Sequence, residues 1–130
     1  IESRLHGRAD ALAHAERAQL LLTVQQEELA LDDAAAAVAI NPELVQAHLI
    51  LARVFASRGI TKAAKSAYRR ILQLDAKHLS ALEELAKLHM QLGDYKDAIA
   101  LFRRRLDLSP NKYLQQAYEQ CFASLQLPKP

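Results

Sequence analysis

The sequence of 130 residues contains no tryptophan, one cysteine and three glycines, and only 5% of its residues are aromatic. The single cysteine, Cys121, excludes an intramolecular disulfide and gives no sign of an oxidising compartment. No apolar run approaches the roughly 18 to 20 residues of a transmembrane helix, and no signal peptide is visible. We therefore expect neither a disulfide-stapled fold nor contact with a membrane from this domain itself.

A second set of absences concerns catalysis. The sequence has no glycine-rich phosphate loop and no GxSxG nucleophile motif. Its histidines never lie three or four residues apart, so no helix offers a histidine pair to a metal; they are His6, His14, His48, His78 and His89. We expect no enzyme, no cofactor and no metal site. His14 and His48 fall at equivalent places of the repeat described below and could face each other, and we interpret them as packing residues.

What the sequence has in abundance is helix-forming residues. Ala, Leu, Gln, Glu, Lys and Arg dominate, and the length suits one domain. The formal net charge is +2, but residues 1–44 carry three arginines against eight acidic residues, whereas the rest carries fourteen basic against seven acidic residues. The chain begins at Ile1 rather than Met, as a piece of a longer protein would. The sequence leaves the compartment open, with the cytoplasm as the default.

The chain repeats itself with a period of about 34 residues, a length typical of helical repeat proteins. The stretch SRGITKAAKSAYRRILQLDAK (57–77) is followed one period later by QLGDYKDAIALFRRRLDLSPN (91–111). Residues of the same kind coincide under this shift, and they are Leu51 with Leu85, Ala52 with Ala86, Gly59 with Gly93, Ala64 with Ala98, Tyr68 with Phe102, Leu72 with Leu106, and Leu74 with Leu108. A further shift finds a weaker copy nearer the N-terminus, through Ala18, Ala30, Val38 and Ile40.

Each copy has the pattern of two helices joined by a turn. Residues of one face recur at helical spacing, and they are Leu82, Leu85, Ala86 and His89 before the turn and Ala98, Leu101, Phe102 and Leu106 after it. Gly93 is predicted to end the first helix in the left-handed conformation, and Pro110 to stop the second. One such hairpin cannot bury its own apolar face, so the copies are expected to stack.

This pattern resembles the tetratricopeptide repeat family, whose unit is a helix-turn-helix with the same period. The resemblance implies an all-α fold, an α-α superhelix or solenoid of helix-turn-helix units with a C-terminal capping helix. The implied divisions are an N-terminal flank (1–10), a degenerate unit (11–44), two regular units (45–78 and 79–112), the capping helix (113–127) and a tail (128–130).

The first copy departs from the family pattern. It has Arg17 where leucine is expected, Ala34 where an aromatic residue is expected, and no turn glycine between Leu22 and Leu31. In the third copy, Arg105 stands where the family has a small inward-facing residue. Its aliphatic stem must therefore pack inside or bend away toward solvent.

The resemblance also implies a place for binding. In the family, the first helices of successive units line a concave groove, which is expected to bind a peptide or a helix of a partner protein. The residues carried over to this groove are Leu12, Glu16, Gln19, Gln46, Leu49, Ile50, Arg53, Ser57, Ser80, Glu83, Glu84, Lys87 and Gln91. Leu49 and Ile50 would be its exposed apolar centre, unless the capping helix or a neighbouring subunit covers them.

Family members that bind chaperones hold the carboxylate end of the ligand with a clamp of lysine, asparagine and arginine side chains. Here the matching positions hold Ala15, Gln19, Ile50, Ser80 and Glu84. An acidic tail would meet Glu83 and Glu84 in place of cations, and like charges repel across an interface. We therefore expect an amphipathic helix or extended segment with an apolar anchor and a basic residue near Glu83 and Glu84.

Two other functions stay open. The acidic residues of the first copy could meet the basic later copies of a second chain and form a homo-oligomer by head-to-tail contacts; these residues are Glu27, Glu28, Asp32 and Asp33. Nucleic acid could bind the cations that coincide under the repeat, which are Lys62 with Lys96, Arg69 with Arg103, and Arg70 with Arg104. These rows lack interleaved aromatic residues for base stacking, so we favour a solvated face over a nucleic-acid partner.

Overall fold

The structure is a computed structural model. It describes the backbone of residues 2–126 and the side chains from residue 9 onward. Ile1, the predicted tail (128–130) and the last residue of the predicted capping helix lie outside the described residues. The chain forms two compact units, residues 1–74 and residues 75–130, which we call the N-terminal unit and the C-terminal unit.

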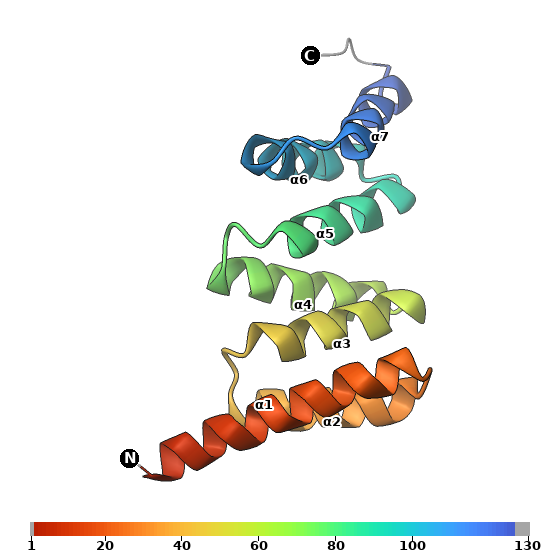
Figure 1. Cartoon of the computed structure of the whole chain (residues 1–130). Helices are drawn as coiled ribbons and strands as arrows, with labels where there is room; N and C mark the ends of the chain where they lie inside the picture. The colour runs from red at the N-terminus through yellow and green to blue at the C-terminus, as the bar shows by residue number, and fades with distance from the viewer. Residues whose placement is uncertain (1, 127–130) are drawn as a thin grey trace. The chain divides into compact units, whose positions relative to one another are not determined.

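Seven α-helices and no strand make up the described part of the chain (Figure 1). The helices of the N-terminal unit are α1 (Glu2–Thr23), α2 (Glu27–Ile40), α3 (Val45–Ser57) and α4 (Thr61–Leu74). Those of the C-terminal unit are α5 (Leu79–Gln91), α6 (Tyr95–Leu108) and α7 (Lys112–Ser124). The predicted all-α class is therefore confirmed, and α1 extends through most of the segment expected to be an N-terminal flank.

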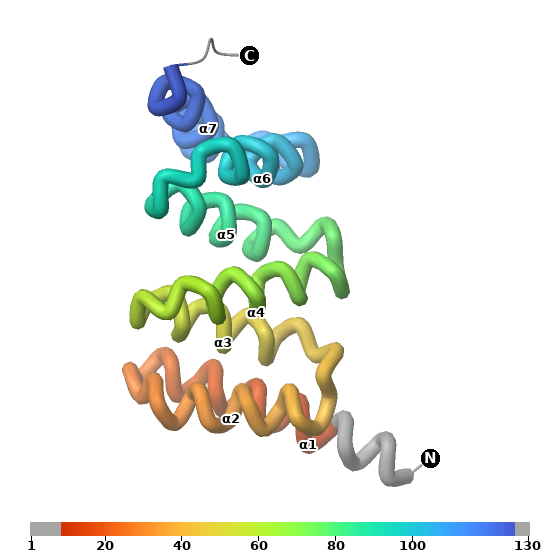
Figure 2. Tube along the Cα trace, turned by 180° about the vertical axis from the view of Figure 1, so that it is seen from behind, coloured from red at the N-terminus to blue at the C-terminus, as the bar shows by residue number. Residues whose placement is uncertain are grey.

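The helices form three successive pairs, which we call repeat 1 (α1 and α2), repeat 2 (α3 and α4) and repeat 3 (α5 and α6). The two helices of each pair pack against each other and run in opposite directions (Figures 1 and 2). The second helices begin at Glu27, Thr61 and Tyr95, so each begins one sequence period after the one before. The period of the sequence is thus the period of the helix pairs.

The turn inside each pair contains one residue with positive φ. Gly59 (φ 73°) and Gly93 (φ 81°) take this position in repeats 2 and 3, as predicted for Gly93. In repeat 1 the position belongs to Gln25, with φ 62°. The missing glycine therefore does not remove the turn, but Gln25 holds a conformation in which a side chain costs about 1 kcal/mol or more.

The core of the N-terminal unit is built largely from alanine. One buried cluster contains Ala18, Ala30, Ala34, Ile50 and Val54, and a second contains Ala15, Ala37 and Ala47. Small side chains let helix backbones approach closely, so α2 can pack against both α1 and α3 without a large residue at Ala34. Ile50 and Val54 of α3 supply the bulk of the first cluster.

The C-terminal unit has larger side chains in its core. Phe102 of α6 is fully buried, and Leu82 and Leu85 of α5 are buried as well. Helix α7 packs on α6 and buries one face, with Tyr118 and Phe122 in edge-to-face contact at 5.1 Å between ring centroids. The amphipathic pattern of the predicted capping helix is therefore seen in α7, within the residues that the structure describes.

Candidate functional site

A hollow of about 460 Å³ opens in the N-terminal unit between α1 and α3. Its lining combines apolar and polar side chains from the two helices, and these are Ala15, Glu16, Gln19, Leu20, Gln46, Leu49 and Ile50. The lining positions on each helix are three or four residues apart, which places them on one face of an α-helix. Two contacting helices therefore present their facing stripes to one space.

Burial divides the hollow into a floor and a rim. Ile50 and Ala15 are each 2% exposed and form the floor, and Leu49 is partly buried. Leu20 is 66% exposed at the rim. The groove residues predicted from the sequence did not include Leu20, although it lies four residues after Glu16 and on the same helical face.

The expectation that Ile50 is exposed is wrong. Its side chain belongs to the buried cluster with Ala18, Ala30 and Ala34, so only its edge borders the hollow. The side chains around Ile50 in this cluster are small alanines, which let α3 pack closely enough to bury it. Of the predicted apolar centre, Leu49 alone keeps substantial exposure.

The other predicted groove residues of the N-terminal unit are Leu12, Arg53 and Ser57, and they lie on the same two helices outside the described lining. Leu12 is exposed, at 41%. Ser57 donates a hydrogen bond from its hydroxyl to the carbonyl oxygen of Val54, at 2.8 Å. That bond uses the hydroxyl group of Ser57 as a donor within its own helix, at the end of α3.

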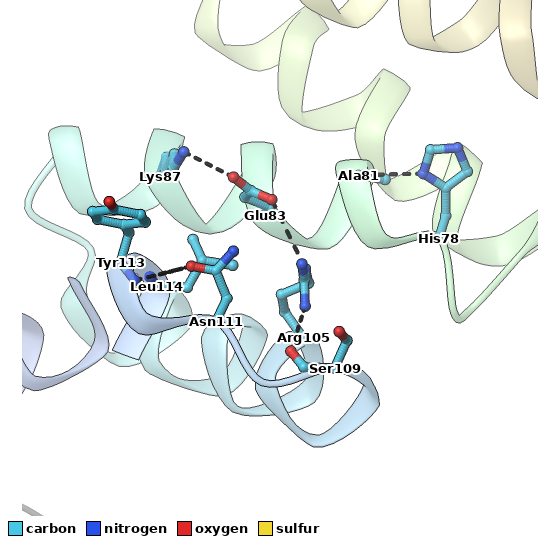
Figure 3. Close-up of polar contacts among 9 residues, drawn as sticks. All are labelled: His78, Ala81, Glu83, Lys87, Arg105, Ser109, Asn111, Tyr113 and Leu114. Atoms are coloured by element: carbon cyan, nitrogen blue, oxygen red, sulfur yellow. Dashed lines mark hydrogen bonds and ion pairs between the residues drawn. The ribbon is translucent and has the colours of Figure 1, made fainter. Parts of the chain in front are cut away.

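The predicted groove residues of the C-terminal unit all lie on α5, and they are Ser80, Glu83, Glu84, Lys87 and Gln91. Glu83 accepts a hydrogen bond from Lys87 Nζ at 2.9 Å and lies 3.8 Å from Arg105 Nε (Figure 3). Two cations of the chain therefore already compensate the charge of Glu83. A basic ligand residue at this place would have to compete with them.

Arg105 packs inside the C-terminal unit, the first of the two outcomes that its position allowed. Its side chain is 9% exposed, and its Nη1 donates to the carbonyl oxygen of Ser109 at 2.7 Å (Figure 3). With Glu83 beside it, the buried guanidinium joins the end of α6 to α5. The neighbouring Arg103 and Arg104 are exposed, but they donate to the hydroxyl of Tyr118 and to the carbonyl oxygen of Ala76.

A polar cluster joins α1 and α2 in repeat 1, in addition to their alanine packing. Arg17 donates two hydrogen bonds to the carboxylate of Asp33, one of them from Nε at 2.7 Å, and His14 Nδ1 lies 3.0 Å from the same carboxylate. Chiefly through the bond from Arg17, and against the effect of burial, the pKa of Asp33 is lowered from 3.8 to about 2. The ion pair also raises the pKa of Arg17.

The two histidines of the N-terminal unit have separate partners. His14 contacts Asp33, whereas His48 is buried and its Nε2 lies 2.7 Å from the carbonyl oxygen of Pro42. His48 thus fits the packing interpretation, while His14 belongs to the polar cluster. The idea that they face each other finds no support in these contacts.

One group of possible metal ligands escaped the sequence analysis. His89, Asp94 and Asp97 offer three ligand atoms that all lie within 4.8 Å of one another. Their spacing in the sequence does not reveal them, because only the turn between α5 and α6 brings them together.

In the part of the chain that the structure describes, no helix is both long and apolar enough to span a membrane.

The family comparison agrees with this architecture. A family model for the tetratricopeptide repeat matches residues 55–121, about half of the chain. No curated protein matches the sequence.

Solved structures of low identity share the fold. A crystal structure of MamA has a TM-score of 0.84 at 15% identity, over 91% of this chain and 65% of the MamA chain. YrrB, described as having an unusual peptide-binding site, has a TM-score of 0.83 at 20% identity, over 95% of this chain and 64% of the YrrB chain. The chain therefore spans less than two thirds of either protein.

A third structure includes a bound ligand. The first tetratricopeptide repeat domain of Spaghetti (RPAP3), bound to the HSP90 peptide SRMEEVD, has a TM-score of 0.85 at 16% identity, over 92% of this chain and 95% of that domain. At such identities the likeness concerns the fold, and the ligand belongs to that protein.

Proposed function

Because this chain belongs to the tetratricopeptide repeat family, we propose that it is a non-catalytic protein-interaction module that binds a partner segment in the hollow between α1 and α3. Members of the family are in general non-catalytic scaffolds, which supports an interaction module. The observation that supports this location is the hollow itself, whose volume of about 460 Å³ falls in the size range of ligand pockets.

The lining favours an apolar anchor on the partner. Leu20 and Leu49 expose apolar surface beside the buried Ile50, and removing such surface from water is favourable by about 25 cal/mol per Å² before the entropic costs of association. Gln19 and Gln46 can exchange hydrogen bonds with the backbone of a bound segment. Glu16 is the one charged residue of the lining, so a basic residue beside the anchor fits best.

The same lining disfavours an acidic chain end. The family's chaperone-binding members have clamp residues at five positions, and two of these positions hold Ala15 and Ile50 in this chain. Both residues form the buried floor, and their side chains offer no hydrogen-bond donor to a carboxylate. The peptide SRMEEVD, bound by the RPAP3 domain, is therefore a suitable negative control. We expect no binding of this peptide at concentrations where an apolar-basic peptide saturates the domain.

The test begins with selection of peptides from a random library displayed on phage, with the whole chain as bait. Affinity of the selected peptides is then measured by fluorescence anisotropy against the wild type, Leu20→Glu and Leu49→Glu. We expect each substitution to weaken binding at least tenfold, because it places a charge where the anchor docks. Leu29→Glu is the matched control, since Leu29 is an exposed leucine of α2 outside this hollow.

Circular dichroism of each variant separates loss of binding from loss of fold. Unchanged affinity in Leu20→Glu and Leu49→Glu, with intact helices, would refute the location. If Glu84→Lys then abolished binding, the interaction module would stand, with its site on α5. Ile50 is excluded from the test because a charge at this buried position would unfold the N-terminal unit.

Head-to-tail assembly is the alternative function, but fewer acidic residues than predicted are free of contacts within the N-terminal unit. Asp33 is bound to Arg17, and Glu27 Oε2 lies 3.3 Å from Arg58 Nε, so both are engaged within the N-terminal unit. Glu28 and Asp32 stay exposed. Sedimentation velocity at low and high salt decides, because a molar mass independent of salt and concentration is incompatible with assembly by charge.

A further inference from the structure

Three side chains of metal-binding type meet at the turn between α5 and α6. His89 lies in the last turn of α5, Asp94 is the N-cap residue of α6, and Asp97 is in the first turn of α6. His89 Nδ1 is 3.5 Å from Asp94 Oδ2 and 4.0 Å from Asp97 Oδ2. The positive φ of Gly93 turns the chain back on itself and brings the two helix ends together.

The burial and hydrogen bonding of the His89 imidazole also indicate a ligand at this turn. The residue is 3% exposed, and its Nδ1 has no hydrogen-bond partner among the described residues. The separation of 3.5 Å from the nearest carboxylate oxygen exceeds the usual 2.7–3.2 Å of an N–H···O hydrogen bond. A buried ring nitrogen that lies near two carboxylates and has no hydrogen-bond partner is rare in native proteins.

The spacing suits a small divalent cation. Two ligand atoms bound to zinc at about 2.0–2.2 Å, with a tetrahedral angle between them, lie about 3.4 Å apart. The distance from His89 Nδ1 to Asp94 Oδ2 is close to this value. Asp97 is largely exposed, so its side chain can move the short remaining distance at little cost.

The chemistry of the donors narrows the choice of ion. One imidazole nitrogen and two carboxylate oxygens suit Zn²⁺ and its neighbours Co²⁺ and Ni²⁺, whereas Ca²⁺ and Mg²⁺ prefer oxygen ligands alone. The positive end of the α6 dipole opposes a cation here, and the negative end of α5 favours it. The negative charges of the two carboxylates add to the effect of α5, so the local electrostatics favour a cation.

We propose that His89, Asp94 and Asp97 bind one divalent transition-metal ion of the zinc class and thereby fasten the α5–α6 turn. Three protein ligands leave a coordination position for water or for a group from a partner. The ion would hold the end of α5 against the start of α6. Metal binding should therefore stabilise the C-terminal unit.

The experiment uses the full chain, freed of metal with a chelator. Zn²⁺ is titrated by calorimetry, Co²⁺ by its visible absorption, and thermal unfolding is followed with and without Zn²⁺. We expect one ion per chain, displacement of Co²⁺ by Zn²⁺, and a higher melting temperature with Zn²⁺. Asp97→Asn should weaken binding at least tenfold, because it removes the negative charge of an exposed ligand without touching the core.

Two further variants separate the site from the fold. Asp94→Asn keeps the size of the side chain and loses a ligand charge, so it should weaken Zn²⁺ binding, and thermal unfolding of its apo form measures any separate effect on the fold. Asp107→Asn is the matched control, since Asp107 is an exposed aspartate of α6 outside the cluster, and it should bind as the wild type does.

Two results would overturn the proposal. The first is absence of Zn²⁺ and Co²⁺ binding to the chain. The second is equal affinity in the wild type and in the Asp94→Asn, Asp97→Asn double variant, because the ion would then bind elsewhere on the chain.

Discussion

Repeats 1 and 3 have the same helix-turn-helix architecture with different chemistry at equivalent positions. Where repeat 3 has Leu85 and Leu101, both buried, the positions two periods earlier in repeat 1 hold Arg17 and Asp33. The carboxylate of Asp33 accepts two hydrogen bonds from Arg17. The comparison shows that one pair of equivalent positions on the two helices can hold buried apolar side chains or an ion pair.

The two solutions differ in their physical consequences. Apolar burial does not depend on pH, whereas an ion pair requires that the carboxyl stays ionised. Repeat 1 also has Ala34 at the place of Phe102 and Gln25 at the place of Gly93.

The largest effect is expected from the aromatic residue of repeat 3. Phe102→Ala should lower the free energy of unfolding by about 3–5 kcal/mol, because it empties a fully buried site that the surrounding helices can fill only in part. Urea unfolding followed by circular dichroism measures this loss. Tyr113→Ala is the control, since Tyr113 is 75% exposed and its removal should change stability little. A loss below about 1 kcal/mol in Phe102→Ala would show that repeat 3 does not depend on apolar filling.

An intermediate effect is expected from the ion pair of repeat 1. The pKa of Asp33 is about 2 in the folded chain and 3.8 as its usual value. A carboxyl with a lowered pKa contributes stability that is fully present above 3.8 and is lost as the pH falls toward 2. Asp33→Asn should therefore destabilise the protein near neutral pH and flatten the acid limb of its stability profile.

Urea midpoints measured at a series of pH values between about 5 and 2 test this expectation, in the window that the pKa of Asp33 defines. Asp32→Asn is the matched control, because Asp32 is the exposed neighbour of Asp33. If the two variants have the same acid profile, the pair between Arg17 and Asp33 contributes nothing to the stability of repeat 1.

The repeats show which features a sequence can predict. The period, the turn at Gly93 and the inward face at Ala98 and Phe102 could be predicted, because each depends on residue types at fixed local spacing. The exposure of Ile50 was predicted wrongly, since it depends on which side chain fills the space beside Ala34.

The candidate sites were predicted only in part for the same reason. Glu16, Gln19, Gln46 and Leu49 border one hollow, and they were predicted because the family resemblance assigns these positions to the groove. The cluster around His89 needs the three-dimensional path of the turn, and no helical period encodes it. Asp33 was considered only for a contact with a second chain, because a sequence does not show which opposite charge lies across a helix pair.

The smallest effect is expected at the turns, where repeats 1 and 2 differ by one residue. Gln25→Gly should raise stability by about 1 kcal/mol, because glycine adopts the observed positive φ without the steric cost of a side chain. Gly59→Gln should lower stability by a similar amount, and an added side chain at Gly59 would meet no neighbouring atom, so only the backbone conformation is tested. Melting temperatures of the two variants, alone and combined, measure both effects. Opposite shifts that cancel in the double variant would establish that the two turns are equivalent, whereas a loss of stability in Gln25→Gly would mean that the glutamine side chain itself holds the first turn.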